Sequence, residues 1–467
     1  MNTPARITGV AGGSDGLAAA YDQVLDLATS YDSAGDRMRG WAGADARTLA
    51  NGDLLESALL SPPTFAEAEA VLLAAAGGPE GVLVESVSWE TDAILLRVTV
   101  RSFRETDELV HAAFEVLDYA AGRAIGATLP ATVPMLLGLG LLGVVDGDDL
   151  QQWAIEHPEL LQHVVNGGGG LLDGLVDSSA PLTPGGPFGL ATFTPDTESA
   201  AGLLAALYGP DGAASVEARD LGVPSSDSQP GSLADVIGHL GELGALSGPE
   251  HPENNGTIEV QTFTDANGEV RHIVYLPGTD DMATLPWTQD ADVRDLATNL
   301  QLVAGHDNTY QQGILDAMHQ AGIGAGDPVL LAGHSQGGME AAAILSEGSD
   351  FNVTSVVTAG SPTAQVDGFP PGTHVLSLEH EGDVVPLLDG EENPDSVQQV
   401  TVHFGDGGTD IVDHHSFPHY VAGAAAVDAS DDPSIVESLQ SLADHGFLAD
   451  GSGQTVTSRT FQITRSP

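Results

Sequence analysis

Residues 328–345 read Pro328-Val-Leu-Leu-Ala-Gly-His-Ser-Gln-Gly-Gly-Met-Glu-Ala-Ala-Ala-Ile-Leu345, a short apolar run followed by a glycine-flanked serine and a helical pattern. The apolar run Val329–Ala332 is typical of a buried parallel strand, and Gly338–Leu345 is rich in helix formers. Between them lies the pattern G-x-S-x-G, an elbow in which a sharp strand-to-helix turn lifts the serine above a sheet. The stretch therefore predicts an exposed nucleophile at Ser335. The alternative is a chance glycine-rich turn, because 58 of the 467 residues are glycine.

The amino-acid totals limit the classes of function. A chain of 467 residues has room for two or three domains of the usual ~100–200 residues each. The formal charge is −54, and all 13 basic side chains are arginine. Such a surface repels phosphate backbones, so we expect no nucleic-acid partner. The absence of cysteine excludes disulfides, thiolate metal sites and cysteine nucleophiles.

No targeting or membrane-spanning segment is apparent. Residues Met1–Val10 carry no apolar core of a Sec signal peptide, so we expect a cytoplasmic protein or one exported by a non-Sec route. The most apolar run, Ala131–Val145, contains a proline and three glycines and is shorter than the ~20 residues that span a bilayer. We interpret it as a buried helix or helical hairpin, with a segment that contacts a membrane as the alternative, and expect no integral membrane segment.

The sequence pattern divides the chain into three regions. Residues 1–126 carry apolar positions at helical spacing, with a break near Gly40–Gly43, and predict antiparallel helices. Residues 127–256 are first apolar and glycine-rich and then rich in loops, and we expect a connecting region that could serve as a lid. Residues 257–467 alternate strands with helices. This alternation predicts an α/β fold with a mostly parallel sheet covered by helices on both faces.

Within the last region the pattern gives the individual elements. Strands are predicted at residues 258–263, 270–276, 329–333, 353–358, 374–378 and 397–404. Helices are predicted at residues 291–303, 309–321, 338–346, 415–426 and 433–443. A polar strand at residues 454–463 is expected at an edge of the sheet.

A serine on such an elbow needs a base and an acid that orients the base, and in hydrolases of this type they follow in the order serine, acid, histidine. Asp383 directly follows a predicted strand, where its carboxylate would stand at the sheet edge beside the elbow. His415 comes after the next strand and would take the proton of Ser335 while Asp383 holds its other ring nitrogen. His414 and His419 remain alternative bases.

Two further features complete the candidate site. The oxyanion formed during acyl transfer needs backbone N–H donors, and we expect one from Gln336, the residue after the nucleophile, and one from Thr279 in a Pro-Gly-Thr turn. Trp287, close to that turn in sequence, is a candidate for lining an acyl pocket, and a packed aromatic side chain is the alternative. A histidine-rich metal cluster formed by residues 413–419 is the alternative interpretation of the base motif. We expect neither metal nor cofactor.

Five motifs in one order resemble the class 3 lipase-like branch of the α/β-hydrolases, which includes actinobacterial members with helical N-terminal extensions. They are Tyr275–Thr279, Gly333–Gly338, Thr358–Pro362, Gly382–Pro386 and His415–Tyr420, and the resemblance covers roughly residues 257–428. It implies an α/β-hydrolase fold in which Ser335 is the nucleophile, Asp383 the acid and a histidine of residues 415–420 the base.

A second resemblance concerns the N-terminal region. Trp41-Ala42-Gly43, placed between helical stretches, resembles the W-x-G turn of the WXG100 proteins, small helical hairpins linked to type VII secretion. No Tyr-x-x-x-Asp/Glu signal follows the second helical pattern. The resemblance implies a helical hairpin that could bind a protein partner. The alternative is a tryptophan that is simply packed in a turn between helices.

The sequence therefore predicts a serine hydrolase that cleaves carboxylic esters of lipid or acyl type, without a cofactor. One alternative is a secretion-associated interaction protein whose hydrolase domain is vestigial. Another is an acyltransferase or a peptidase on the same fold, because all of these share the acyl-enzyme.

Overall fold

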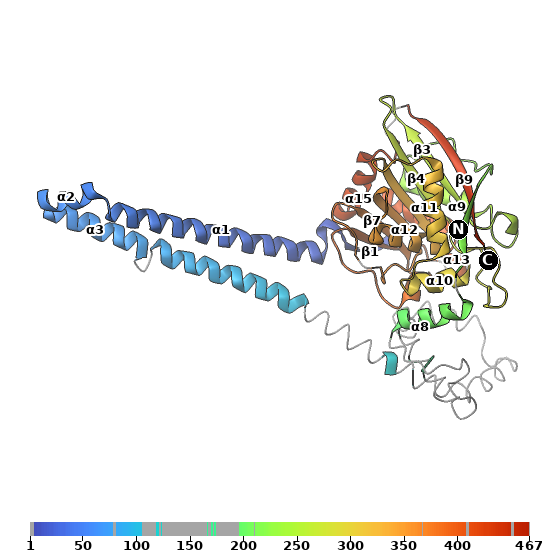
Figure 1. The fold of residues 1–467 in the computed structure, drawn as a ribbon, viewed down its shortest axis with the longest axis horizontal. Coiled ribbons are helices and arrows are strands. Elements are labelled where there is room, and N and C mark those ends of the chain that lie inside the picture. The colour runs from blue at the N-terminus through green and yellow to red at the C-terminus, as the bar shows by residue number, and fades with distance from the viewer. Residues whose placement is uncertain are drawn as a thin grey trace. The chain divides into compact units, whose positions relative to one another are not determined.

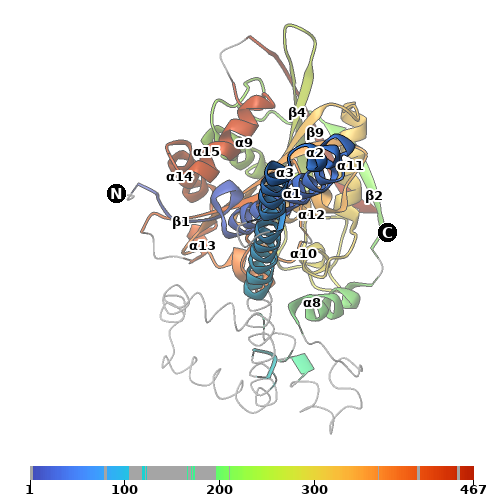
Figure 2. The ribbon, with the colours of Figure 1, turned by 90° about the vertical axis from the view of Figure 1, so that its left-hand side faces the viewer.

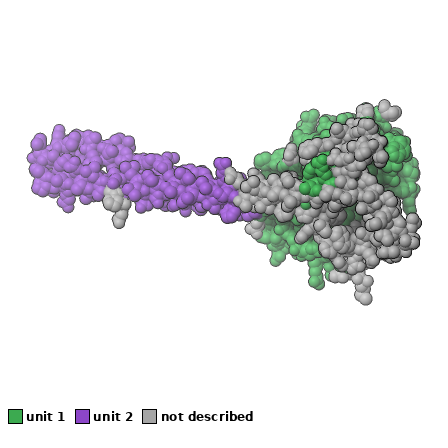
Figure 3. Space-filling model, turned by 90° about the horizontal axis from the view of Figure 1, so that it is seen from below, with its two compact units in different colours: residues 1–16, 113–467 green, residues 17–112 purple. Residues whose placement is uncertain are grey.

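The structure is a computed structural model. It describes residues 4–77, 81–104, 118–120, 123, 166, 170, 172–173, 196–209, 211–366, 368–407, 411–449 and 453–466. The chain divides into two compact units, one of residues 1–16 and 113–467 and the other of residues 17–112 (Figure 3). Residues 131–145, expected to form a buried helix, lie outside the described residues.

A nine-stranded mixed sheet forms the centre of the larger unit (Figure 1). Its order is β1-β8-β7-β6-β5-β4-β3-β9-β2. The strands from β4 to β8 run parallel to one another, whereas β1, β3, β9 and β2 pair antiparallel with their neighbours. The strands are β1 (Arg6–Gly12), β2 (Ala213–Arg219), β3 (Thr257–Thr264), β4 (Val270–Leu276), β5 (Pro328–His334), β6 (Asn352–Ala359), β7 (His374–His380), β8 (Gln399–Gly405) and β9 (Thr455–Ser466).

Helices cover both faces of the sheet, so the central strands are buried on both sides. One face packs against α9 (Leu233–Gly244), α14 (Phe417–Asp428) and α15 (Pro433–Asp444). The other packs against α11 (Thr309–Ala321) and α12 (Gln336–Glu347), as Figure 2 shows. Alternate residues of β5 face the two layers: Leu330 belongs to the first apolar core and Leu331 to the second.

Shorter elements connect these layers at the carboxyl ends of the parallel strands. The helix α10 (Leu296–Val303) begins at Asp295, whose side chain accepts a hydrogen bond from the N–H of Thr298 and so caps it. The helix α8 (Thr197–Ala205) packs against α10. The 3-10 helix η4 (Val385–Asp389) follows β7, and the short helix α13 (Ile411–His414) precedes α14.

The smaller unit is helical, as the sequence predicts. It contains α1 (Leu17–Leu49), α2 (Gly52–Leu60), α3 (Pro62–Gly77) and a helix over residues 82–104. The last helix runs antiparallel to α1, because Arg104 contacts Asp22 at 3.3 Å and Arg39 contacts Glu90 at 2.5 Å. By length and composition alone, one stretch, Pro62–Arg104, could cross a membrane, and residues 78–80 within it lie outside the described residues. The absence of an integral membrane segment therefore stays a prediction.

The break predicted near Gly40–Gly43 is wrong. α1 continues through this segment to Leu49, and Trp41 lies within the helix with 57% of its surface exposed. A glycine inside a helix costs only about 1 kcal/mol relative to alanine, so two glycines need not end a 33-residue helix. The turn proposed from the W-x-G resemblance is therefore not present at this position.

The sheet also differs from the predicted one. It is mixed rather than mostly parallel, with four parallel and four antiparallel pairings. The region predicted as residues 257–467 recruits β1 and β2 from outside its boundary, and α9 is buried in its core. The C-terminal strand β9 is not at an edge, because β2 pairs with its outer side. The helix predicted over residues 291–303 begins only at Leu296.

Candidate active site

Ser335 stands at the junction between β5 and α12. Its backbone has φ 54° and ψ −124°, and it is the only non-glycine residue with a positive φ in the described part of the chain. Such a conformation costs on the order of 1–3 kcal/mol and persists only where the surroundings enforce it. Here the Ser335 N–H donates to the carbonyl of Ala359 on β6 at 2.9 Å. The Ser335 carbonyl accepts from the N–H of Gly338 at 3.0 Å.

The glycines of the motif are required by close backbone approach. A Cβ on Gly337 would lie 1.9 Å from the carbonyl oxygen of Leu276 at the end of β4. A Cβ on Gly333 would lie 2.3 Å from the backbone carbon of Gly337. Real side chains cannot make such contacts. The turn can therefore sit tightly over the sheet only with glycine at these positions.

Asp383 and His415 are joined by a hydrogen bond of 2.6 Å between Oδ2 and Nδ1. Asp383 also accepts from the hydroxyl of Tyr420 at 2.6 Å and from the N–H of Val385 at 2.9 Å. Burial by itself would raise the pKa of Asp383, but the hydrogen bonds from His415 and Tyr420 outweigh it and lower this pKa. An ionised Asp383 fixes the proton of His415 on Nδ1 and leaves Nε2 free to accept another.

The other two candidate histidines lie elsewhere. His414 is 1% exposed, and neither of its ring nitrogens has a hydrogen-bond partner among the described residues. His419 is held between Asp406, 2.5 Å from Nδ1, and Asp413, 3.1 Å from Nε2. Burial opposes protonation of His419, yet these hydrogen bonds raise its pKa. An imidazole that keeps its proton is a poor general base.

A cavity of about 840 Å³ brings Ser335, His415 and Thr279 together. Most of its wall is apolar, formed by Pro249, Pro277, Met282, Leu296, Leu300, Val303, Met339, Pro362, Val384, Val385, Leu388 and Phe417. Trp287 does not line it and is 79% exposed, so neither the acyl-pocket role nor the alternative of a packed aromatic side chain is found at this position. The cavity size suits a ligand of roughly drug size or an acyl chain.

The hydroxyl of Ser335 makes no hydrogen bond to His415 or to any other described residue. Both side chains nevertheless face the same cavity. Catalytic hydrogen bonds of this kind are often long and close when substrate binds. The arrangement is compatible with proton transfer from Ser335 to Nε2 of His415.

The two expected oxyanion donors are linked through Asn299, which sequence reasoning did not identify. The side-chain amide of Gln336 donates to Asn299 Oδ1 at 3.0 Å, and Asn299 Nδ2 donates to Thr279 Oγ1 at 3.0 Å. The backbone N–H of Gln336 is the first of α12 and has no carbonyl acceptor within the helix. Asn299 thus fixes the two donors relative to each other.

Arg294 holds the loop that carries Thr279. Its side chain is fully buried and donates to the carbonyl of Gly278 at 3.0 Å. It also forms an ion pair with Asp280 at 2.6 Å. These contacts flank Thr279 on both sides, so the loop is fixed at the point where an oxyanion donor is needed. The available sequence signal was that Arg294, one of only 13 arginines in a chain without lysine, lies close in sequence to the Pro-Gly-Thr turn.

His334 is a further residue that the motif alone does not explain. Its Nε2 donates to the carbonyl oxygen of His415 at 2.9 Å, which anchors the backbone of the base beside the nucleophile. Burial, reinforced by the proximity of His415, lowers the pKa of His334 to about 3. It is therefore neutral at pH 7 and acts as a support.

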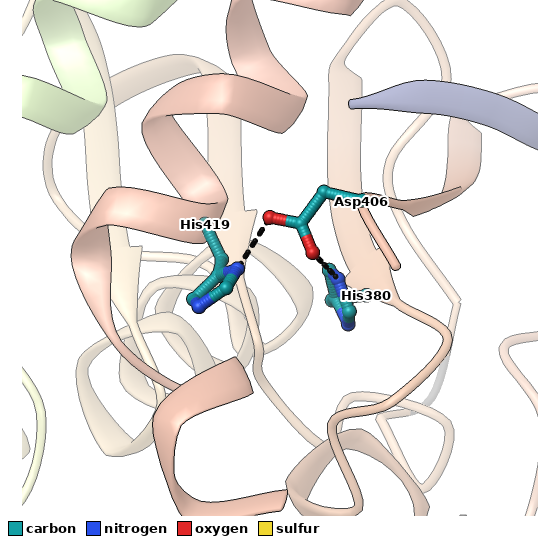
Figure 4. Close-up of side chains that lie close together, drawn as sticks. All are labelled: His380, Asp406 and His419. Carbon is teal, nitrogen blue, oxygen red and sulfur yellow. Dashed lines mark hydrogen bonds and ion pairs between the residues drawn. The ribbon is translucent and has the colours of Figure 1, made fainter. Parts of the chain in front are cut away.

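Of the residues expected as a metal cluster, His415 is engaged with Asp383, whereas Asp413 contacts Nε2 of His419 at 3.1 Å and the ring of His414 lies beside that of His419. His419 also meets His380 and Asp406, and one ligand atom of each lies within 4.8 Å of the others (Figure 4).

No model of a known protein family matches the chain, and no curated protein or solved structure matches it either.

Proposed function

We propose that the chain is a serine hydrolase of α/β-hydrolase type, of the class 3 lipase-like branch, that cleaves carboxylic esters of lipid or acyl type. One observation carries the proposal: His415, bonded to Asp383 at 2.6 Å, faces the same apolar cavity as the strained Ser335. A strained backbone conformation at a polar residue that lines an apolar cavity costs free energy, and such strain is typical of active sites.

The proposed reaction begins when Ser335 Oγ attacks the ester carbonyl and passes its proton to Nε2 of His415. Asp383 stabilises the imidazolium, and its own hydrogen bonds from Tyr420 and Val385 keep it ionised. The N–H groups of Gln336 and Thr279 stabilise the oxyanion. His415 then returns the proton to the alcohol that leaves, and a water activated by the same imidazole releases the acid from the acyl-enzyme.

The apolar wall of the cavity favours a substrate whose bound part is an uncharged, apolar acyl group. Among the residues lining the cavity, Arg294 carries a fixed positive charge, and Asp280 already neutralises it. The formal charge of −54 further disfavours anionic substrates.

Turnover of p-nitrophenyl esters of increasing acyl length tests the proposal. We expect Ser335→Ala to lower kcat at least about a thousandfold, because the nucleophile is lost while the fold is kept. The matched control is Ser349→Ala, since Ser349 does not line the cavity and its hydroxyl, among the described residues, accepts only from the N–H of Phe351 at 3.3 Å. Equal turnover by Ser335→Ala and wild type would contradict the proposal. Transfer of the acyl group to an added alcohol, giving a new ester instead of the free acid, would indicate an acyltransferase.

A protein partner for the smaller unit is a second proposal. The helices α2 and α3 are apolar yet contain no buried residue, and Leu59 and Leu60 are 88% and 87% exposed. Exposed apolar clusters of this kind are typical of interaction surfaces. If Ser335 reacts with a fluorophosphonate, binding through this surface is a function additional to hydrolysis. If Ser335 does not react, binding is the function that we propose in place of hydrolysis.

A further inference from the structure

Three side chains outside the proposed triad converge beside it. His380 is the last residue of β7, Asp406 directly follows β8, and His419 lies in the first turn of α14. Because β7 and β8 are parallel, their carboxyl ends meet at the sheet edge that also carries Ser335. All three residues are buried, with exposures of 4%, 7% and 8%.

The three side chains point at one another (Figure 4). Asp406 uses one oxygen to contact Nδ1 of His419 at 2.5 Å and the other to contact Nε2 of His380 at 3.2 Å. One ligand atom from each residue lies within 4.8 Å of the other two. Metal–ligand bonds of about 2.0–2.2 Å in a tetrahedral site place ligand atoms roughly 3.4 Å apart, so only small shifts are needed.

A buried histidine beside these residues gives a second observation. The ring of His414 stacks on His380 with centroids 4.3 Å apart and meets His419 edge-on at 5.2 Å. It is 1% exposed, and both ring nitrogens lack a hydrogen-bond partner among the described residues. A buried polar group without a partner is costly, and packing alone would favour an apolar residue there.

The groups around the two histidines have opposite effects on metal binding: one orients His419 for coordination, and the other holds the proton of His380 on the wrong nitrogen. Asp413 contacts Nε2 of His419 at 3.1 Å, and a carboxylate on the far nitrogen of a ligating histidine orients the ring. On His380 the N–H of Gly382 donates to Nδ1 at 2.9 Å, which places the ring proton on Nε2. Coordination through Nε2 therefore requires the proton to move to Nδ1 and the Gly382 hydrogen bond to open.

We propose that His380, Asp406 and His419 bind a divalent transition-metal ion, and that this ion is Zn²⁺. Two imidazoles and one carboxylate form a donor set that zinc accepts, with a fourth position left for water or for His414 after rotation of its side chain. His380 precedes Asp383 by three residues, and His419 follows His415 by four. The ion would thus link the segment of the proposed acid to that of the proposed base. The site itself does not depend on ester hydrolysis.

Zinc titration of the full chain, without a histidine tag and after treatment with EDTA, tests this inference. Isothermal titration calorimetry measures the binding, in a buffer that contains excess Mg²⁺ to occupy the surface carboxylates. We expect one tight Zn²⁺ per chain. Asp406→Asn and His419→Ala should each weaken binding at least about a hundredfold, and Asp413→Asn, which removes only the orienting carboxylate, about 10- to 100-fold.

His251→Ala is the matched control, because His251 forms an exposed pair with Glu253 at 3.6 Å and should bind no zinc of this affinity. Zinc binding that is unchanged in both Asp406→Asn and His419→Ala would overturn the proposal, as would the absence of tight binding in wild type. Should a variant fail to fold, Co²⁺ added to wild type gives a second measurement. Intense visible absorption of a four-coordinate ion supports the site, and the weak spectrum of a six-coordinate ion contradicts it.

Discussion

Tyr420 connects the proposed acid to the helix that follows the proposed base. Its hydroxyl, fully buried on α14, donates to Asp383 Oδ2 at 2.6 Å, the same oxygen that contacts His415. A hydrogen bond to an ionised group contributes about 1.5–3 kcal/mol. Tyr420 therefore acts as a positioning residue for the pair Asp383–His415.

Tyr420→Phe should lower kcat/KM for a p-nitrophenyl ester by about tenfold or more, because Asp383 loses one of the donors that keep it ionised. Steady-state kinetics at several pH values measure the effect, and a rise in the pH needed for activity would accompany it. Tyr310→Phe is the matched control, since the buried hydroxyl of Tyr310 has no hydrogen-bond partner among the described residues. Equal kinetics in the two variants would show that Tyr420 has only a packing role.

Asp389 gives a prediction for stability. Burial raises the pKa of Asp389 to about 7, although the N–H of Ala364 donates to its carboxyl at 2.8 Å. In the unfolded chain an aspartate has a pKa of about 3.9. The folded state therefore binds more protons between about pH 4 and 7. Across that range this group lowers the free energy of unfolding as pH rises, by up to about 1.4 kcal/mol per unit.

Asp389→Asn should remove this dependence, because the amide is neutral in both states and its oxygen can still accept from Ala364. Urea unfolding of both proteins at pH 5, 6, 7 and 8 measures it. The variant should gain stability relative to wild type as pH rises to 7, and the difference should then level off. Parallel curves across the range would contradict the assigned pKa.

Local motifs were sufficient to select Ser335, Asp383 and His415 as candidates, because each follows a recognisable strand. The structure places Ser335 and His415 beside one cavity and Asp383 within hydrogen-bond distance of His415, and their catalytic roles stay a prediction. Their supports were not predictable from the sequence alone. Tyr420 is 37 residues from Asp383, and the carbonyl bound by His334 is 81 residues away. Such contacts depend on strand order and helix placement, which periodicity does not give.

At the scale of elements, the turn between β5 and α12 is constrained by close approach of main-chain atoms. Gly337 packs so closely on the end of β4 that a Cβ would meet the backbone of Leu276 at 1.9 Å. The contact is with main chain, so no side-chain rotation can relieve it. The position of Ser335 therefore depends on this approach between α12 and β4.

Gly337→Ala should destabilise the protein by several kcal/mol, about 2–4, and abolish ester turnover, because α12 must move away from β4. Thermal and urea unfolding measure the loss. Gly238→Ala is the matched control: it lies within α9, and a Cβ there meets no atom within 4 Å. That exchange should stabilise by about 0.5–1 kcal/mol. A stable, active Gly337→Ala protein would contradict the observed packing.

The central strands could be predicted because they are apolar and bounded by turn residues, and β4 matches its predicted range of 270–276. The outer strands β1 and β2 could not be predicted in this way. β2 is polar, with the sequence AASVEAR, and β1, with the sequence RITGVAG, directly precedes a long helical pattern. Both are recruited by pairing with distant strands, β9 and β8, and this tertiary effect outweighs local propensity.

At the scale of the whole molecule, the two units make different contributions to the candidate site. Each residue placed in the site belongs to the unit of residues 1–16 and 113–467. Residues 1–16 supply β1, which covers the edge of β8. The helical residues 17–112 form a separate unit, and every described residue that lines the cavity belongs to the other unit.

Replacing residues 18–111 with a flexible linker should leave a protein that unfolds cooperatively and retains turnover of short esters. Removing residues 1–16 should instead expose the edge of β8 and lower stability or cause aggregation. Thermal unfolding and size-exclusion chromatography of both variants test the division. Loss of folding in the first and normal behaviour in the second would contradict it.

Reaction of the full-length protein with a fluorophosphonate, followed by peptide mass spectrometry, tests the central claim most directly. A serine activated by His415 in an accessible cavity attacks the phosphorus, whereas an ordinary serine does not. We predict one adduct per chain, on Ser335, that is absent after unfolding in urea and much slower to form in His415→Ala. A natively folded chain that stays unlabelled at Ser335 would contradict the account.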